Sequence, residues 1–444
     1  MRAGLLFLLC SALAGSSPDP QASPVVRAMR DEMERTIQRL QLPGMARPYY
    51  TSYTVLDVET ITIEGSLGEI HKRERDRMRT LKIDLRVGDR ALDNSNFFGG
   101  PGGWFGAGGV GRVALDDDYD AIRREIWLAT DSAYKQALQT LEARKATRKS
   151  EQRKDEAVDS LSQETAVTTI VEGQPASFDE ESLARLARKV SAFFRSSPEI
   201  QSDKVSVLAL SFCRVFVSSE GALAREPGSL VRLDVAAQTQ ANDGMPLKSF
   251  FSVSARSTEG LPPETELLER ARLVVEQLKQ LRSAPVLEDY AGPVLFEGLA
   301  AAQVMRALLA ANLSGAPAPD SDNPQMSRTF APESALASRL GKRVMPEGWR
   351  VVDDPGRERL GDRDLVGAYR VDDQGIPAQK VVLIDDGILK TLLMSRAPRK
   401  EIANSNGHGR ASLLGKARAT PGNLFITPAK ALGAKQLQAR LLEQ

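Results

Sequence analysis

The sequence is poor in the residues that build metal centres and disulfide frameworks. Among its 444 residues are two cysteines and two histidines, too few for a cysteine-rich zinc module, an iron–sulfur protein or a disulfide scaffold. The net charge is also close to zero, because the sequence has 59 Lys and Arg residues and 58 Asp and Glu residues. No overall field therefore attracts nucleic acid or an anionic membrane. What remains is an ordinary globular composition, long enough for two or three domains.

Long hydrophobic runs are missing as well. The longest apolar run near the start, Gly4 to Ala14, is about 11 residues and too short to span a hydrocarbon core of ~30 Å. Arg2 precedes this run, and Ala12-Leu13-Ala14 follows within it as a small-x-small cleavage site. Residues 1–20 are therefore predicted to be a secretory signal peptide, the alternative being a buried N-terminal helix. The mature chain is expected to be periplasmic or extracellular and free of the membrane.

Residues 21–286 are predicted to form an N-terminal α+β domain. Apolar and polar residues alternate at period two in segments 48–87 and 205–255, which is typical of half-buried antiparallel strands. Helical spacing of apolar residues predicts four helices around them. They cover residues 26–41, a segment after Asp118, a segment opened by the capping box Ser177-x-x-Glu180, and residues 264–282.

Two segments of this region lack a clear period. Residues 99–111 are rich in glycine, yet no Lys-Ser/Thr pair follows and the spacing does not suit a dinucleotide-binding turn. We therefore predict a flexible loop that carries Trp104 and Phe105, rather than a phosphate site. Residues 144–170 are predicted to be a helix tail and polar linker, solvated because they have little to bury.

Residues 287–444 are predicted to form a second, β-rich domain with a curved sheet. An Ala/Leu-rich helix ends near Leu313, and a Pro/Ser/Asp-rich loop follows it. Beyond the loop, alternation predicts strands at Trp349–Val352, Leu365–Val371, Lys380–Ile384 and Leu389–Ser395. The fold class expected for the whole chain is α+β: helices on a mostly antiparallel sheet, then the β-rich domain.

Several short motifs of the second half occur in a specific order. Their order and spacing across residues 290–425 resemble the TldD/PmbA family, metallopeptidase-like proteins that include the modulator of DNA gyrase. The resemblance implies a two-domain architecture and pairing of subunits through the C-terminal domain. Family chains usually continue further, so it also implies more strands beyond Gln444. The motifs are Ser218–Gly221, Gly292–Glu297, Val352–Pro355, Asp372–Pro377, Gly387–Lys390 and Asn406–Arg410.

The resemblance also implies where a zinc site would lie. Catalytic members carry His-Glu-x-x-x-His on a helix, where two histidines hold zinc beside a glutamate base, and a later cysteine adds a ligand. The motif maps here onto Phe296, Glu297 and Ala301, and no cysteine follows Cys213. Phenylalanine and alanine cannot donate electrons to zinc. Only Glu297 keeps its position, as the candidate catalytic residue, and no metal or other cofactor is expected.

His408 and Arg410 are the candidate peptide-binding residues, because both lie in a glycine-flanked loop. A plain turn is the alternative for His408. His71 lies among charged residues and is expected at the surface. The acidic pairs Asp353-Asp354 and Asp372-Asp373 do not have the spacing of a calcium loop, and no Gly-x-Ser-x-Gly nucleophile elbow is present.

Three functions remain open. The first is a non-catalytic subunit, like the PmbA/TldE half of the family's protease, that pairs with a TldD-like or self subunit and binds extended or unfolded peptides by strand addition. The second is a divergent metallopeptidase in which Glu297 is the base and unusual residues or a partner chain hold the metal. The third is an extracytoplasmic scaffold that has lost the ancestral role. The sequence favours the first.

Overall fold

The computed structural model describes residues 23–99, 110–151, 158–287, 289–330, 333–412 and 415–443. The predicted signal peptide, residues 1–20, lies outside the described residues. Residues 100–109 of the glycine-rich loop lie outside them as well. The described helices are α1 (Pro24–Arg39), α2 (Tyr119–Ser150), α3 (Glu180–Ala192), α4 (Glu264–Ser283), α5 (Gly298–Met305), α6 (Pro324–Phe330) and α7 (Ala434–Leu442). None of the helices in this part of the chain is both long and apolar enough to cross a membrane.

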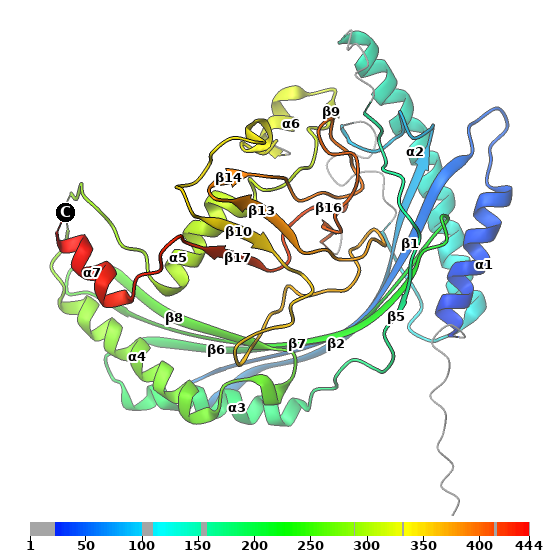
Figure 1. Ribbon diagram of the computed structural model, residues 1–444. Helices are drawn as coiled ribbons and strands as arrows, with labels where there is room; N and C mark the ends of the chain where they lie inside the picture. Colours follow the sequence, from blue (N-terminus) through cyan, green and yellow to red (C-terminus); the bar gives the residue numbers. More distant parts are fainter. Residues whose placement is uncertain are drawn as a thin grey trace, which may run out of the picture.

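A long, mostly antiparallel sheet dominates the first half of the chain. Among the described residues it has seven strands in the order β4-β2-β1-β6-β7-β5, with β8 also paired to β7. Figure 1 shows the sheet curving around the C-terminal region, with helices on its outer face. The strands are β1 (Pro48–Ser66), β2 (Glu69–Val87), β4 (Val110–Arg112), β5 (Thr168–Ile170), β6 (Ser202–Ser218), β7 (Leu223–Gln240) and β8 (Pro246–Ala255).

Two hydrophobic cores hold the helices against the outer face of this sheet. Helices α1 and α2 cover one end, where Tyr53, Leu81 and Ile83 pack against their apolar stripes. Helices α3 and α4 cover the other end, over a core that includes Val205 and Leu233. The odd-numbered residues of β2, β6 and β7 face the helices, because side chains alternate between the two faces of a strand. The period-two prediction for these segments is confirmed.

The C-terminal region is β-rich but less regular. Its largest sheet has the order β14-β13-β10-β17, over a third core that includes Val351 and Leu383. The expected strand at Leu365–Val371 is wrong, and of that at Leu389–Ser395 only Leu389 lies in a named strand, because both segments bond through turns instead of a continuous ladder. The strands are β3 (Phe97–Phe98), β9 (Asp320–Ser321), β10 (Arg350–Asp353), β11 (Arg359–Leu360), β12 (Arg363–Asp364), β13 (Val381–Asp385), β14 (Ile388–Leu389), β15 (Gly409–Arg410), β16 (Arg418–Ala419) and β17 (Leu424–Thr427).

The predicted polar linker, residues 144–170, is not simply solvated. Helix α2 continues to Ser150, Arg144 and Ser160 are buried, and β5 pairs in parallel with β7. The prediction failed because polar side chains in this stretch bond to the fold instead of to water. Arg144, for example, donates from Nε to Asp320 Oδ2 at 2.7 Å.

Buried charges join the N-terminal sheet to the C-terminal region. Arg396 is 1% exposed, donates to both carboxylate oxygens of Glu220 and to the Ser162 carbonyl, and stacks over the ring of Tyr50 at 5.0 Å. Desolvated charges of this kind persist only when they are paired and hydrogen-bonded. The α+β class is confirmed, and the predicted boundary near residue 286 falls in the segment between α4 and α5.

Candidate functional site

Glu297 lies at the start of helix α5. Its backbone is extended, with φ −119° and ψ 157°, and its side chain does not bond to the first amides of the helix. The carboxylate is exposed and accepts one hydrogen bond, from Gln438 Nε2 of α7 at 3.3 Å. The predicted position of Glu297 near a helix N-terminus is therefore confirmed.

The surroundings of Glu297 are apolar. Phe296 is 50% exposed beside it, and Ala301 is half-buried within the helix. In the described part of the chain, no group of three or more His, Cys, Asp or Glu residues is placed to hold a metal ion. The residues at this helix therefore do not fit zinc: a phenyl ring and a methyl group occupy two ligand positions that the resemblance implies.

His408 is completely buried. Its Nε2 lies 3.0 Å from Asp353 Oδ1, and its Nδ1 lies 2.9 Å from the backbone carbonyl oxygen of Asn406. The amide of Gly422 also donates to Asp353 Oδ1. These contacts tie the end of β10 to the loop before β15. A peptide has no access to this imidazole in the structure, so His408 supports the fold rather than a binding surface.

Arg410 remains accessible, with 34% of its side chain exposed. Its guanidinium lies 4.0 Å from the ring centroid of Tyr369, and its Nε is 3.5 Å from Asp373 Oδ2. Asp373 in turn accepts from Arg214 of β6 at 2.5 Å. This chain of contacts orients Arg410 between the inner face of the long sheet and the C-terminal region.

Asp372 anchors the turn beneath this network. Gly375, at φ 82°, completes the turn, and the buried carboxylate accepts from the amides of Gln374, Ile376 and Gly409. Burial nevertheless raises the pKa of Asp372 from 3.8 to about 6, because desolvation outweighs the three hydrogen bonds. Asp372 can therefore gain a proton just below neutral pH, but its carboxyl group is fully buried.

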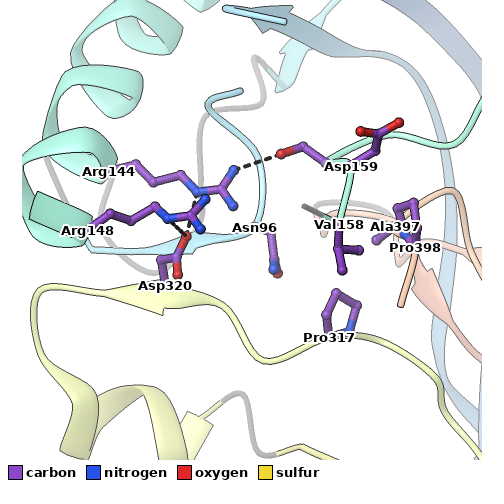
Figure 2. Close-up of a pocket in the computed structure, with 10 residues that line it drawn as sticks. Asn96, Arg144, Arg148, Val158, Asp159, Pro317, Asp320, Ala397 and Pro398 are labelled. Carbon is purple, nitrogen blue, oxygen red and sulfur yellow. Dashed lines mark hydrogen bonds and ion pairs between the residues drawn. The ribbon is translucent and has the colours of Figure 1, made fainter. Parts of the chain in front are cut away.

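A small cavity lies where the end of α2 meets the C-terminal region (Figure 2). Its volume is about 140 Å³, and Asn96, Pro317 and Pro398 contribute to its wall. Arg144 lines it but is committed to the fold, since it also donates to the carbonyls of Asp93 and Ser95 at 2.9 and 2.8 Å. The cavity therefore lies where the two halves of the chain meet, and the charge of Arg144 in its wall is paired with that of Asp320.

Sequence reasoning missed the role of Arg144. A signal was present: Arg144 lies three residues after Leu141 and seven after Ala137, on the stripe of α2 that is buried. A cation at that spacing indicates a buried ion pair when its partner is supplied by a distant segment, here Asp320.

Comparison with known proteins identifies the C-terminal region first. Residues 290–442 match the PmbA/TldA metallopeptidase C-terminal domain. This chain is 38% identical over 97 residues to a metalloprotease of Methanocaldococcus jannaschii and 32% identical over 78 residues to a metalloprotease of Archaeoglobus fulgidus. The C-terminal region of this chain, residues 290–442, is therefore a domain of the PmbA/TldA metallopeptidase type. These matches cover 22% and 18% of the chain, and 20% and 17% of the two relatives.

The likeness to solved structures extends over nearly the whole chain. A modulator of DNA gyrase from Thermotoga maritima has a TM-score of 0.61 at 16% identity, covering 93% of this chain and 80% of that one. TldE from Thermococcus kodakarensis has a TM-score of 0.60 at 14% identity, with coverage of 94% and 80%. At these identities the likeness establishes the fold of the chain.

Proposed function

We propose that this chain is a non-catalytic, peptide-binding partner subunit of the PmbA/TldE type in an exported proteolytic complex. The observation that carries the proposal is the composition of helix α5. Where catalytic relatives are expected to hold zinc, Phe296 before the helix and Leu299 within it are exposed, and the helix buries none of its residues. A helix of this kind suits contact with another chain better than metal binding.

The apolar surface around α5 supports a partner subunit. Helix α7 also buries none of its residues, and Gln438 joins it to Glu297 of the neighbouring element. We call the two helices and their exposed apolar side chains the α5–α7 surface. Contiguous exposed apolar side chains mark interaction sites in monomeric chains, and the expected partner is a TldD-like subunit or a second copy. The exposed apolar residues are Val294, Phe296, Leu299, Leu308, Leu437 and Leu442.

Peptide binding is assigned to the neighbourhood of Arg410. Its guanidinium is held by Tyr369 and Asp373 yet stays partly exposed, so its N–H groups can donate to a peptide carbonyl or carboxylate. Strand β17 pairs with β10 alone among the described strands, which leaves an edge for strand addition. Main-chain bonding of this kind accepts extended peptides of many sequences.

The test of the partner role is reconstitution of the full chain with a TldD-like relative that keeps the His-Glu-x-x-x-His motif. Cleavage of an unfolded peptide should need both chains. Leu299→Glu should weaken the complex at least tenfold, because it places a charge in the α5–α7 surface. The matched control is Leu273→Glu on α4, since Leu273 and Leu299 are both 53% exposed. Equal loss with both variants would contradict the proposal.

The divergent-metallopeptidase alternative makes the opposite prediction. If Glu297 were a base acting on metal-bound water, Glu297→Gln would reduce the rate of the reconstituted complex a hundredfold or more while assembly stayed intact. A full equivalent of zinc bound to the isolated chain would also favour that alternative. Export is tested separately: mass spectrometry of the native protein should place its N-terminus between Gly15 and about Gln21.

A further inference from the structure

Arg410 has hydrogen-bond donors that the described part of the protein does not use. Its guanidinium carbon lies 4.0 Å from the ring centroid of Tyr369, and its Nε lies 3.5 Å from Asp373 Oδ2. The second distance is that of an ion pair and is longer than an ordinary N–H···O hydrogen bond. Among the described residues, the guanidinium therefore donates no hydrogen bond, although it is held in place from two sides. Its N–H groups are left for water or for a bound molecule.

The carboxylates of the network around Arg410 already have other donors. Asp373 accepts from Arg214 at 2.5 Å and from the Ala411 amide at 2.7 Å. Glu226 accepts from Arg214 and from two backbone amides. Because both carboxylates are bonded elsewhere, neither occupies the donors of Arg410. A matching acceptor therefore has to come from outside this network.

The geometry of the guanidinium favours a carboxylate over a peptide carbonyl. Two parallel N–H groups of arginine match the two oxygens of a carboxylate, and such charge-assisted bonds are about twice as strong as hydrogen bonds between neutral groups. A carbonyl of the peptide backbone offers a single oxygen. Stacking on Tyr369 fixes the plane of these donors before any ligand binds, so less entropy is lost on binding.

Arg410 lies near the N-terminal end of β17. The ring of Tyr369, on which it stacks, packs on Gly422, since a Cβ at Gly422 would lie 3.0 Å from that ring. Gly422 is two residues before β17 begins, about 7 Å along an extended chain. Gly367 and Pro355 also pack on Gly422, at 3.0 and 2.9 Å from the same Cβ position. A strand paired with the open edge of β17 would therefore meet these residues just before β17 begins.

From these positions, and resting on the peptide-binding role proposed above, we infer that the site takes the free C-terminal end of an unfolded chain. The neighbouring strands β14, β13, β10 and β17 all pair antiparallel, and a peptide that continues this pattern runs antiparallel to β17. Its C-terminus then lies beside the N-terminal end of β17, next to Arg410. The terminal carboxylate accepts the paired N–H groups of Arg410, whereas an internal segment would bring only a neutral carbonyl to them.

The first test compares two peptides on the full chain. The probe is a short peptide of Ser, Thr and Val with an uncharged fluorescent label at its N-terminus, and its binding is followed by fluorescence anisotropy at pH 7. The free acid should bind at least tenfold more tightly than the same peptide with a C-terminal amide, because the amide removes the charge and one acceptor oxygen. Equal binding of the two peptides would overturn the inference and leave the peptide-binding role intact. Binding of neither would overturn both.

Variants locate the carboxylate. Arg410→Gln should bring the free acid to the affinity of the amide, and Arg410→Lys, which keeps the charge but not the paired donors, should lose most of the preference as well. The matched control is Arg357→Gln, because Arg357 also stacks on a ring, that of Phe425 of β17, at 4.9 Å. This control should leave the preference unchanged. Loss of the preference in Arg357→Gln but not in Arg410→Gln would overturn the inference.

A third peptide separates the chain end from an acidic side chain. It has the C-terminal amide and carries Glu as its last residue, so that its carboxylate is on a side chain. It should bind as weakly as the uncharged amide, because pairing with β17 sets where the chain end lies. Binding as tight as that of the free acid would show a site for acidic side chains and overturn the assignment to the C-terminus.

Discussion

The N-terminal sheet and the C-terminal region place charge in opposite ways. On the sheet, ionised side chains such as Arg75 and Glu59 pair across strands at the surface, and the two cores between the sheet and its helices are apolar. In the C-terminal region, Asp353 and Arg396 are buried and hold loops together. Stability in the first region therefore rests on buried apolar area. In the second region, stability rests on buried charges that are hydrogen-bonded to the protein instead of to water. Removing one partner of such a pair leaves the other charge buried and unpaired.

The sharpest way to test this comparison is Arg396→Met. It removes the cation that Glu220 and the Ser162 carbonyl share, and we expect a loss of about 3–5 kcal/mol in the free energy of unfolding, measured by urea denaturation. The control is Arg232→Met, whose arginine pairs with Asp234 at the surface of the sheet. It should cost less than about 1 kcal/mol. Equal losses would erase the distinction between the two regions.

Leu233→Ala tests the sheet by the same method. Leu233 is fully buried between the sheet and helices α3 and α4, and deletion of its methyl groups leaves a cavity. We expect a loss of about 3 kcal/mol. Unlike the loss in Arg396→Met, it should not vary with pH, because no ionisable group loses a partner. A strong pH dependence would show that charges also stabilise this core.

Asp372 makes a prediction about pH. Its pKa is raised to about 6 in the folded protein, so the folded state binds this proton more tightly than the unfolded chain does. The stability that Asp372 contributes is therefore present below about pH 4 and is lost as the pH rises through about 6, a change of about 3 kcal/mol. Asp372→Asn cannot titrate. Between pH 4 and pH 7, the free energy of unfolding of the wild type should therefore fall by about 3 kcal/mol relative to that of the variant. A difference that does not change with pH would contradict the prediction.

The smallest effect is expected at Glu297. Its carboxylate is exposed and accepts one hydrogen bond from Gln438, so Glu297→Gln should change the free energy of unfolding by no more than about 1 kcal/mol. Leu299→Gln on the same helix is the matched control for a change at this surface. A loss of several kcal/mol would mean that Glu297 has a buried partner in solution.

The regular half of the molecule was predictable in detail. The alternation of Leu81, Ile83, Leu85 and Val87 indicated the strand and its buried face. The capping box Ser177-x-x-Glu180 indicated a helix start close to that of α3, although the residue that caps the helix is Asp179 and not Ser177. The motif around Glu297 likewise indicated a helix start, which the structure has. Periodicity worked there because each element packs through a single repeated face.

The candidate site was predicted less well. His408 has the sequence surroundings of an exposed loop, yet it is buried by Asp353, which lies 55 residues earlier. Arg144 has the surroundings of a solvated helix end, yet Asp320 reaches it from the C-terminal half. In both cases the partner is distant in sequence. The local pattern therefore cannot identify it, although the position of Arg144 on the buried stripe of α2 does indicate that a partner exists.

The sequence by itself determined the α+β class, the strands and helices of the long sheet, and the absence of histidine at the two family ligand positions. Each of these depends on residue type or on spacing within one element. Only the tertiary structure decided which charges are buried, and that Arg410 and not His408 is accessible. These properties depend on segments that meet only after folding, because desolvation and pairing are set by what surrounds a side chain rather than by its neighbours along the chain.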